Sequence, residues 1–236
     1  MLDFLGIGAQ KAGTTWLYEQ LSRHSQLAFP LGKEAHFWNR PHDPTSVADY
    51  LKRFSQAQLI SGEITPAYGM LPLEVIREIY SLCPRLRLIY LIRNPIERAW
   101  SSALMALQRA EMTIEEASDH WFSDHFHSAG SMNRGDYQTC LQNWRAVFPN
   151  TQILILRFEQ IVNEPETLLN RCFEHLGVVQ QSAQQLQSWN CRTPVFTGPG
   201  YPLRPTLKPI LGKLYHERIK SLSLYLHLDF SDWLSF

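Results

Sequence analysis

The chain has 236 residues, 44% of them hydrophobic and 12% aromatic, so it can bury a large core, and one domain spanning residues 1–236 is the simplest prediction. Lysine plus arginine and aspartate plus glutamate each number 22, which gives a formal net charge of zero. This balance excludes the overall positive field that is typical of proteins binding nucleic acid or a membrane surface. Any anion site must therefore be local.

The cysteines and the N-terminal segment indicate the compartment. Four cysteines lie far apart without a Cys-x-x-Cys pair, so neither a zinc site nor a disulfide framework is predicted. We expect reduced thiols and a cytoplasmic location. The apolar segment 2–8 is too short to span a bilayer and lacks the flanks of a signal peptide, so we predict a buried strand there and no membrane segment.

Short apolar runs rich in β-forming residues alternate with amphipathic stretches along the chain. This order predicts an α/β fold, a P-loop-like domain with a central parallel β-sheet flanked by helices. In chain order we predict a strand at 2–8, a helix at 14–24, a strand at 59–64, a helix at 72–83, a strand at 86–93 and a helix from 95 to about 110. Helices at 114–122 and 137–148, a strand at 152–158, a helix at 166–176 and a helix at 207–227 follow. The segment 190–209 carries five prolines and two glycines and predicts a long functional or mobile loop.

The segment 8–16 follows the first predicted strand and opens the first predicted helix, a position that favours anion binding. Its two glycines let the backbone bend around an anion, the N–H groups at the helix start point into the loop, and Lys11 adds a positive charge. Thr14 and Thr15 can cap the helix and donate hydroxyl groups to phosphate oxygens. A glycine turn before a surface helix is the alternative without a function.

The position of the lysine separates this loop from the Walker A motif. Lys11 precedes Gly13, whereas Walker A requires a lysine immediately after its last glycine. A nucleoside-triphosphate enzyme also needs a strand-end aspartate to hold Mg²⁺, but the strand at 86–93 ends in Arg93. The sequence therefore predicts an anion site built from lysine and arginine, without a metal.

A second anion segment begins at Arg93, at the carboxyl end of a predicted strand, where open α/β sheets bind ligands. Arg93 can bind a phosphate through two parallel hydrogen bonds, and Ser101, two helical turns further on, offers a hydroxyl on the same side. The alternative is that Arg93 only pairs with a nearby carboxylate.

The loop at 8–16 and the segment Arg-Asn-Pro-x-x-Arg-x-x-Ser together resemble the 5′-phosphosulfate loop and the 3′-phosphate site of sulfotransferases that use 3′-phosphoadenosine 5′-phosphosulfate (PAPS). Within that superfamily the chain is most similar to the branch of the heparan sulfate N- and 3-O-sulfotransferases and their bacterial relatives. Four further segments match, at residues 33–38, 62–68, 137–144 and 232–233, so the resemblance spans nearly the whole chain. It implies transfer of a sulfuryl group from PAPS to a hydroxyl or amine of a small-molecule or carbohydrate acceptor, release of PAP, and no required metal.

The resemblance also implies roles for single residues. The 5′-phosphosulfate would be held by Lys11, Ala12, Gly13, Thr14 and Thr15, and the 3′-phosphate by Arg93 and Ser101. Trp16 and Phe196 are candidates for lining the nucleotide because aromatic rings stack on bases, although an aromatic side chain in a helix belongs more often to the core. Arg204 is the nearest equivalent of a late Lys-Gly-Arg element that this chain lacks.

Glu34 corresponds to the carboxylate that the family uses as general base, and Lys11 would stabilise charge on the leaving oxygen. His36 could orient Glu34 or share the proton, since an extended segment would place both side chains on one face; a packed, hydrogen-bonded histidine is the alternative. Ile64 stands where the heparan-modifying enzymes have a lysine, and Lys33 is a candidate replacement.

Two other functions stay open on the sequence: a P-loop kinase or nucleotide-binding protein, and a catalytically inactive nucleotide-binding scaffold. The acceptor is not indicated, although the lack of basic clusters disfavours a heparin-like polymer. The segment 110–133, rich in histidines and aromatic residues, is a candidate acceptor-side lid. Its histidines form no defined metal-ligand pattern.

Overall fold

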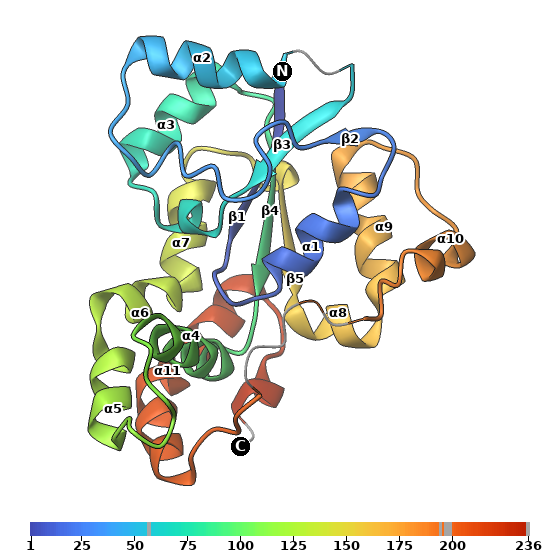
Figure 1. The fold of residues 1–236 in the computed structure, drawn as a ribbon. Coiled ribbons are helices and arrows are strands. Elements are labelled where there is room, and N and C mark those ends of the chain that lie inside the picture. The colour runs from blue at the N-terminus through green and yellow to red at the C-terminus, as the bar shows by residue number, and fades with distance from the viewer. Residues whose placement is uncertain (56–57, 194, 196–199, 235–236) are drawn as a thin grey trace. The chain divides into compact units, whose positions relative to one another are not determined.

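Five parallel strands form one sheet in the order β2-β3-β1-β4-β5 (Figure 1). The strands are β1 (Leu2–Gly8), β2 (Leu27–Ala28), β3 (Ile60–Ile64), β4 (Arg87–Ile92) and β5 (Ile153–Arg157). The structure is a computed structural model, and it describes residues 1–55, 58–193, 195 and 200–234. The parallel sheet with its flanking helices confirms the predicted fold class.

The described residues group into two compact units. The first comprises Met1–Ile92 and Cys140–Phe196 and contains the sheet, and the second comprises Arg93–Thr139 and Thr197–Phe236, each as far as its residues are described. Both units combine segments that are distant in the sequence. One domain over residues 1–236 stays a prediction.

The core of the first unit follows from its two central strands. Phe4, Leu5 and Ile7 of β1 are fully buried, and the apolar run 88–92 of β4 is at most 1% exposed. Continuous apolar runs of this kind are typical of parallel strands that are covered on both faces. In Figure 1, α3 lies on one side of the sheet, and α1 and α9 lie on the other.

The helices of the first unit largely follow the predicted pattern. They are α1 (Thr14–Leu21), α2 (Pro44–Phe54), η1 (Pro66–Met70), α3 (Leu73–Leu82), α7 (Tyr137–Arg145), η2 (Asn150–Gln152), α8 (Phe158–Asn163), α9 (Pro165–Leu176) and α10 (Ala183–Ser188); α7 begins in the second unit. Gly177 follows the last residue of α9 with φ 71°, the left-handed conformation that glycine favours at a helix C-terminus, so the predicted helix at 166–176 ends at its predicted residue. The helix α2 was not predicted from the sequence, although Asp43 and Ser46 form a capping box directly before and within its first turn.

The second unit is helical. It contains α4 (Pro95–Arg109), α5 (Asp119–His127), α6 (Ala129–Arg134), η3 (Pro205–Leu207), α11 (Lys208–Leu226) and η4 (Ser231–Leu234). The predicted helix at 114–122 has the wrong bounds, because the observed helix α5 runs from Asp119 to His127. The helix begins later because the Ser118 side chain accepts the Trp121 amide as an N-cap, while residues 113–116 form a turn closed by the Thr113 amide and the Glu116 carboxylate.

Candidate active site

The loop between β1 and α1 turns at two residues in the left-handed region. Lys11 has φ 69°, and Gly13, the N-cap of α1, has φ 89° and ψ 13°. A Cβ atom on Gly13 would lie 2.4 Å from Ile161 Cδ1 and 3.1 Å from Phe158 Cδ2. Glycine is required here both by the conformation and by the space.

The start of α1 is suited to bind an anion. Its first turn contains no acidic residue, and Gly13 offers no side chain to cap the amides that lack partners within the helix. The positive end of the helix dipole and these N–H groups favour a negative charge, and the partly exposed Lys11 adds a full positive charge. Thr14 is buried and Thr15 is partly exposed in the same turn. The local structure thus agrees with an anion loop, while its ligand stays a prediction.

Of the two aromatic residues predicted to line the nucleotide, Trp16 lies within the described residues. Trp16 is 3% exposed, and its indole N–H donates a hydrogen bond to the Cys191 carbonyl at 2.9 Å. This environment is that of a core side chain, the alternative stated for it. Its contact with a nucleotide stays a prediction, and Phe196 lies outside the described residues.

The segment that carries Glu34 lies at the same sheet edge as the anion loop. The Glu34 amide donates to the carbonyl of Ile64, the last residue of β3, at 2.9 Å, and the amide of Ala9 in the anion loop donates to Leu91 of β4 at 2.6 Å. Because β3, β1 and β4 are parallel neighbours, their carboxyl ends share one edge. The sheet therefore brings together two of the predicted site elements.

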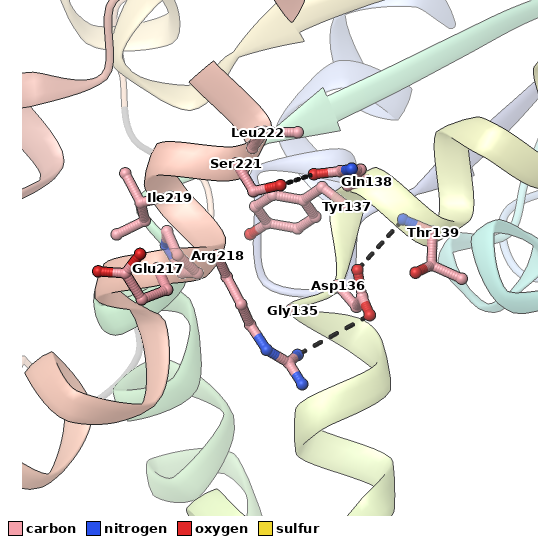
Figure 2. A pocket seen from close by; sticks show the side chains of 11 residues that line it. Gly135, Asp136, Tyr137, Gln138, Thr139, Glu217, Arg218, Ile219, Ser221 and Leu222 are labelled. Atoms are coloured by element: carbon pink, nitrogen blue, oxygen red, sulfur yellow. Dashed lines mark hydrogen bonds and ion pairs between the residues drawn. The ribbon is translucent and has the colours of Figure 1, made fainter. Parts of the chain in front are cut away.

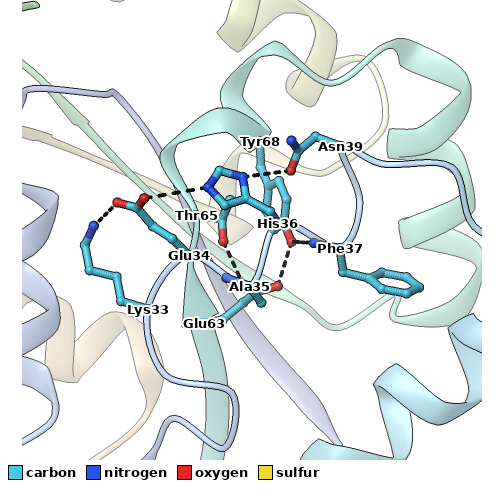
Figure 3. Close-up of polar contacts among 9 residues, drawn as sticks. All are labelled: Lys33, Glu34, Ala35, His36, Phe37, Asn39, Glu63, Thr65 and Tyr68. Atoms are coloured by element: carbon cyan, nitrogen blue, oxygen red, sulfur yellow. Dashed lines mark hydrogen bonds and ion pairs between the residues drawn. The ribbon is translucent and has the colours of Figure 1, made fainter. Parts of the chain in front are cut away.

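The carboxylate of Glu34 contacts both neighbouring polar side chains (Figure 3). One oxygen pairs with the Lys33 ammonium, and the other lies 3.6 Å from His36 Nε2. His36 Nδ1 lies 3.2 Å from Asn39 Oδ1, a partner that was not predicted from the sequence. The Glu34 side chain is 45% exposed, so an acceptor in solvent can reach it.

These neighbours decide the charge of Glu34. Burial raises the pKa of its carboxyl, but hydrogen bonds and charges from Lys33 and His36 act in the opposite direction and outweigh burial, so the net pKa is lowered. Glu34 is therefore ionised at neutral pH and can accept a proton. Lys33 supplies a cation beside this carboxylate.

The segment that carries Glu34 and His36 is not extended, so the condition under which both side chains would share the face of a strand is not met. Glu34 has φ 61° and His36 has φ 55°, so both lie in the left-handed region and not in a strand. Their side chains meet because the backbone curls between them, not because alternate residues of a strand share a face.

A buried carboxylate with no role predicted from the sequence contacts this segment. Glu63 of β3 is fully buried and accepts hydrogen bonds from Tyr50, Thr65, Tyr68 and the Ala35 amide. From the sequence, Glu63 was only part of the segment 62–68 that resembles the family. Its four donors could not be predicted, because they come from separate segments of the chain.

In the second unit, Arg93 pairs with a carboxylate. Its Nε and Nη2 donate to Glu97 Oε2 at 3.1 and 2.9 Å, and its carbonyl accepts the Tyr137 hydroxyl at 2.8 Å. Ser101 lies one turn beyond Glu97 on the same face of α4. Glu97 therefore lies between Arg93 and Ser101, the two residues that are predicted to bind the 3′-phosphate.

Arg204 is also engaged within the second unit. Its guanidinium donates to Asp119 Oδ1 at 2.7 Å and to the Ile114 carbonyl, and it lies 4.7 Å above the Phe122 ring. These contacts link the start of α5 to the segment before η3. A role for Arg204 toward phosphate stays a prediction, and it would require the pair with Asp119 to open.

The candidate lid contains much of the core of the second unit. Phe122 and Phe126 are fully buried, whereas His120 is 86% exposed. The burial of the two rings means that α5 cannot swing away without exposing them. Its role as a lid stays a prediction.

The second unit also has a cavity of about 290 Å³ between the start of α7 and α11 (Figure 2). Its polar side chains already interact: Arg218 lies 4.0 Å from Asp136, and Ser221 donates to Gln138 at 2.7 Å. None of the predicted site residues lines it. We assign it no role.

Among the residues that the structure describes, no group of three or more His, Cys, Asp or Glu side chains could hold a metal ion. Within the same residues, no helix has both the length and the apolar composition needed to cross a bilayer.

A parallel α/β sheet with a glycine loop after β1 and an ionised carboxylate at the same edge is an arrangement typical of nucleotide-binding α/β proteins. Residues 2–192 match the Sulfotransferase domain family, so the chain belongs to that family.

Relatives of the chain agree with this membership. Heparan sulfate glucosamine 3-O-sulfotransferase 6 of Mus musculus is 29% identical over 179 residues, which cover 73% of this chain and 51% of that protein. Carbohydrate sulfotransferase 15 of Homo sapiens is 25% identical over an alignment of 286 residues, gaps included, which covers 90% of this chain and 51% of that protein. The chain thus spans about half the length of the curated relatives it matches.

Solved structures share the fold. A sulfotransferase from Alicyclobacillus acidocaldarius superposes with a TM-score of 0.73 at 22% identity, covering 99% of this chain and 98% of that one. Mouse sulfotransferase SULT7A1, complexed with PAP, superposes with a TM-score of 0.61 at 14% identity, covering 93% and 85%. At these identities the likeness concerns the fold alone.

Proposed function

We propose that this chain transfers a sulfuryl group from PAPS to a hydroxyl or amine of a small-molecule or carbohydrate acceptor, with Glu34 as the general base. The observation that carries the proposal is the half-exposed, ionised Glu34 at the sheet edge that also bears the Lys11 loop. Family membership and relatives named for sulfation of heparan sulfate glucosamine support it.

The donor fits the residues present. Lys11, the uncapped amides of α1 and the Thr14 and Thr15 hydroxyls would bind the 5′-phosphosulfate, because this turn carries no acidic residue to repel it. In the second unit, Arg93 and Ser101 would bind the 3′-phosphate. The PAP complex of SULT7A1 supports a nucleotide of this kind. PAPS supplies a sulfuryl group that is already linked to a good leaving group.

The residues of the chain would act on one proton and on one developing charge. Glu34 takes the proton of the acceptor hydroxyl while the acceptor oxygen forms a bond to sulfur. The bond between sulfur and the phosphate oxygen breaks, and its electron pair leaves with PAP. Lys11 stabilises the negative charge that develops on that leaving oxygen. His36 holds Glu34 from the side opposite Lys33.

Glu34→Gln tests the proposal because it keeps the size of the side chain and removes its ability to accept a proton. With labelled PAPS and an unactivated alcohol, kcat should fall by about 10²- to 10⁴-fold, while PAP binding by calorimetry is unchanged. The loss should be smaller for a nitrophenol, which needs less help to lose its proton. Wild-type rates on the alcohol would exclude Glu34 as the base.

The pH dependence offers a second test. Since the base must be ionised, kcat should fall as the pH drops through the lowered pKa of Glu34. Lys33→Met removes the nearest cation, so the pKa should rise and the acidic limb of the kcat profile should move to higher pH. An unchanged limb would mean that another group titrates.

Two rival functions are separated by ligand choice. A P-loop kinase or nucleotide-binding protein would bind ATP with Mg²⁺ and lose that binding in EDTA, whereas the proposed transfer is insensitive to the chelator. An inactive scaffold would bind PAP without turning over any acceptor in a screen of hydroxylated compounds.

A further inference from the structure

The segment around the proposed base has an unfavourable backbone conformation. Glu34 and His36 both have positive φ, at 61° and 55°. For residues with a Cβ atom the left-handed region is disfavoured, and such conformations persist where the surroundings hold them. Glu34 and His36, the proposed base and its neighbour, are thus the residues whose backbone conformation needs support from other segments.

Backbone amides provide this support. The Glu34 amide donates to the Ile64 carbonyl at 2.9 Å, and the Ala35 amide donates to Glu63 Oε2 at 3.2 Å. The amides of Phe37 and Trp38 donate to the Tyr68 hydroxyl at 2.9 and 3.4 Å. Every amide from 34 to 38 except that of His36 thus has a partner in β3 or η1.

Glu63 is the centre of these contacts. Its Oε1 accepts the hydroxyls of Tyr50 at 2.5 Å and Tyr68 at 2.8 Å, and its Oε2 accepts the Thr65 hydroxyl at 2.9 Å besides the Ala35 amide. An ionised carboxylate has about four acceptor positions, so all of them are filled. A protonated carboxyl or an amide would direct a hydrogen at one of these donors.

The tyrosines remain donors. Burial, with the adjacent Glu63 charge, raises the pKa of Tyr50 and that of Tyr68 above their ordinary values. The Tyr68 hydroxyl therefore donates a hydrogen bond to Glu63, and its oxygen accepts hydrogen bonds from the amides of Phe37 and Trp38. The buried charge is connected to the backbone on both sides of His36.

We infer that Glu63 is a positioning residue: by holding the backbone of residues 34–38, directly and through Tyr68, it keeps Glu34 and His36 in the geometry needed for proton transfer. This inference rests on the proposed function, in which Glu34 is the base. A hydrogen-bonded core cluster without this role would stabilise the fold but leave the alignment of Glu34 unaffected.

A double-mutant cycle separates the two roles. Glu63→Gln keeps the shape and leaves the Ala35 amide or a tyrosine hydroxyl facing an NH₂ group. We expect kcat for an alcohol acceptor to fall about 10²-fold, because small misplacements of a catalytic group have effects of this size, with PAP affinity changed less than threefold. In the Glu34→Gln background, Glu63→Gln should lower kcat less than threefold further, since there is no base left to align.

A matched pair of tyrosine variants covers the case in which Glu63→Gln does not fold. Tyr50→Phe and Tyr68→Phe each remove one buried hydroxyl bonded to Glu63, so similar losses of thermal stability are expected. Only Tyr68→Phe also releases amides of the segment 34–38, so its kcat should fall at least tenfold below that of Tyr50→Phe.

The outcomes are distinct. Equal kcat for the two tyrosine variants, multiplicative losses in the double mutant, or a fully active Glu63→Gln would overturn the positioning role while the proposed base stands. Wild-type turnover by Glu34→Gln would overturn the proposed base, and the inference with it.

Discussion

The two candidate phosphate segments are built in different ways. The loop after β1 relies on the backbone: a left-handed Lys11, a glycine cap with no room for a side chain and an uncapped helix start. The segment at Arg93 relies on side chains along one face of α4, with the arginine held by Glu97. A backbone site tolerates few changes in conformation, whereas a side-chain site can lose one contact and keep its shape.

The largest effect is expected at Gly13. Gly13→Ala places a methyl group 2.4 Å from Ile161 at φ 89°, so strain and overpacking should together lower the free energy of unfolding by about 2–5 kcal/mol and abolish sulfate transfer. Urea unfolding and a PAPS turnover assay measure both. Gly32→Ala is the control, because Gly32 also has positive φ (68°) but its Cβ would have no neighbour nearer than the Tyr18 hydroxyl at 3.9 Å. Equal losses would show that conformation alone, not space, matters at Gly13.

Lys11→Ala should leave the fold intact, because the loop is shaped by its backbone. Removing a charge that acts mainly as the leaving oxygen becomes negative should lower kcat by about 10²- to 10³-fold. Single-turnover rates with labelled PAPS, alongside circular dichroism, provide the measurement. Unchanged turnover in a folded variant would remove Lys11 from the site.

Arg93→Ala should reduce PAPS affinity by about 2 kcal/mol, or roughly 30-fold, because a charge-assisted contact to the 3′-phosphate is lost. Adenosine 5′-phosphosulfate lacks that phosphate, so its affinity should not change. Calorimetry on both nucleotides decides; equal losses contradict the assignment.

The smallest effect is expected at Glu97. Its exposed i,i+4 pair with Arg93 contributes at most about 0.5 kcal/mol to stability. Glu97→Gln should therefore leave the unfolding midpoint nearly unchanged and preserve or slightly raise PAPS affinity, since it removes a negative charge beside Arg93. A loss of affinity as large as that of Arg93→Ala would favour the reading in which the arginine serves mainly this ion pair.

The sequence predicted most of the sheet and the glycine loop because these depend on local signals. The strand at residues 2–8 has its predicted bounds, the loop bends at Gly13, and α9 ends at residue 176 as predicted. The start of α5 was misplaced because Ser118, one of several possible caps, was not distinguished from its neighbours.

The surroundings of the base could not be predicted in the same way. The hydrogen bonds that join Tyr50 and Ala35 to Glu63 cross 13 and 28 residues, so no periodicity in the sequence reports them. The left-handed conformations of Glu34 and His36 are likewise disfavoured by local preference, so no local pattern in the sequence predicts them.

The side chain of Asn94, beside Arg93, donates a hydrogen bond to the carbonyl of Trp233, 139 residues later in the chain. At about 5–20 residues per second, a ribosome needs about 7–28 s to synthesise the intervening segment. Throughout this interval the start of α4 lacks one of its partners, although the loop after β1 was synthesised earlier still. A growing chain would therefore complete the hydrogen bonds at the start of α4 only after Trp233 has been synthesised, long after it has synthesised the loop that follows β1.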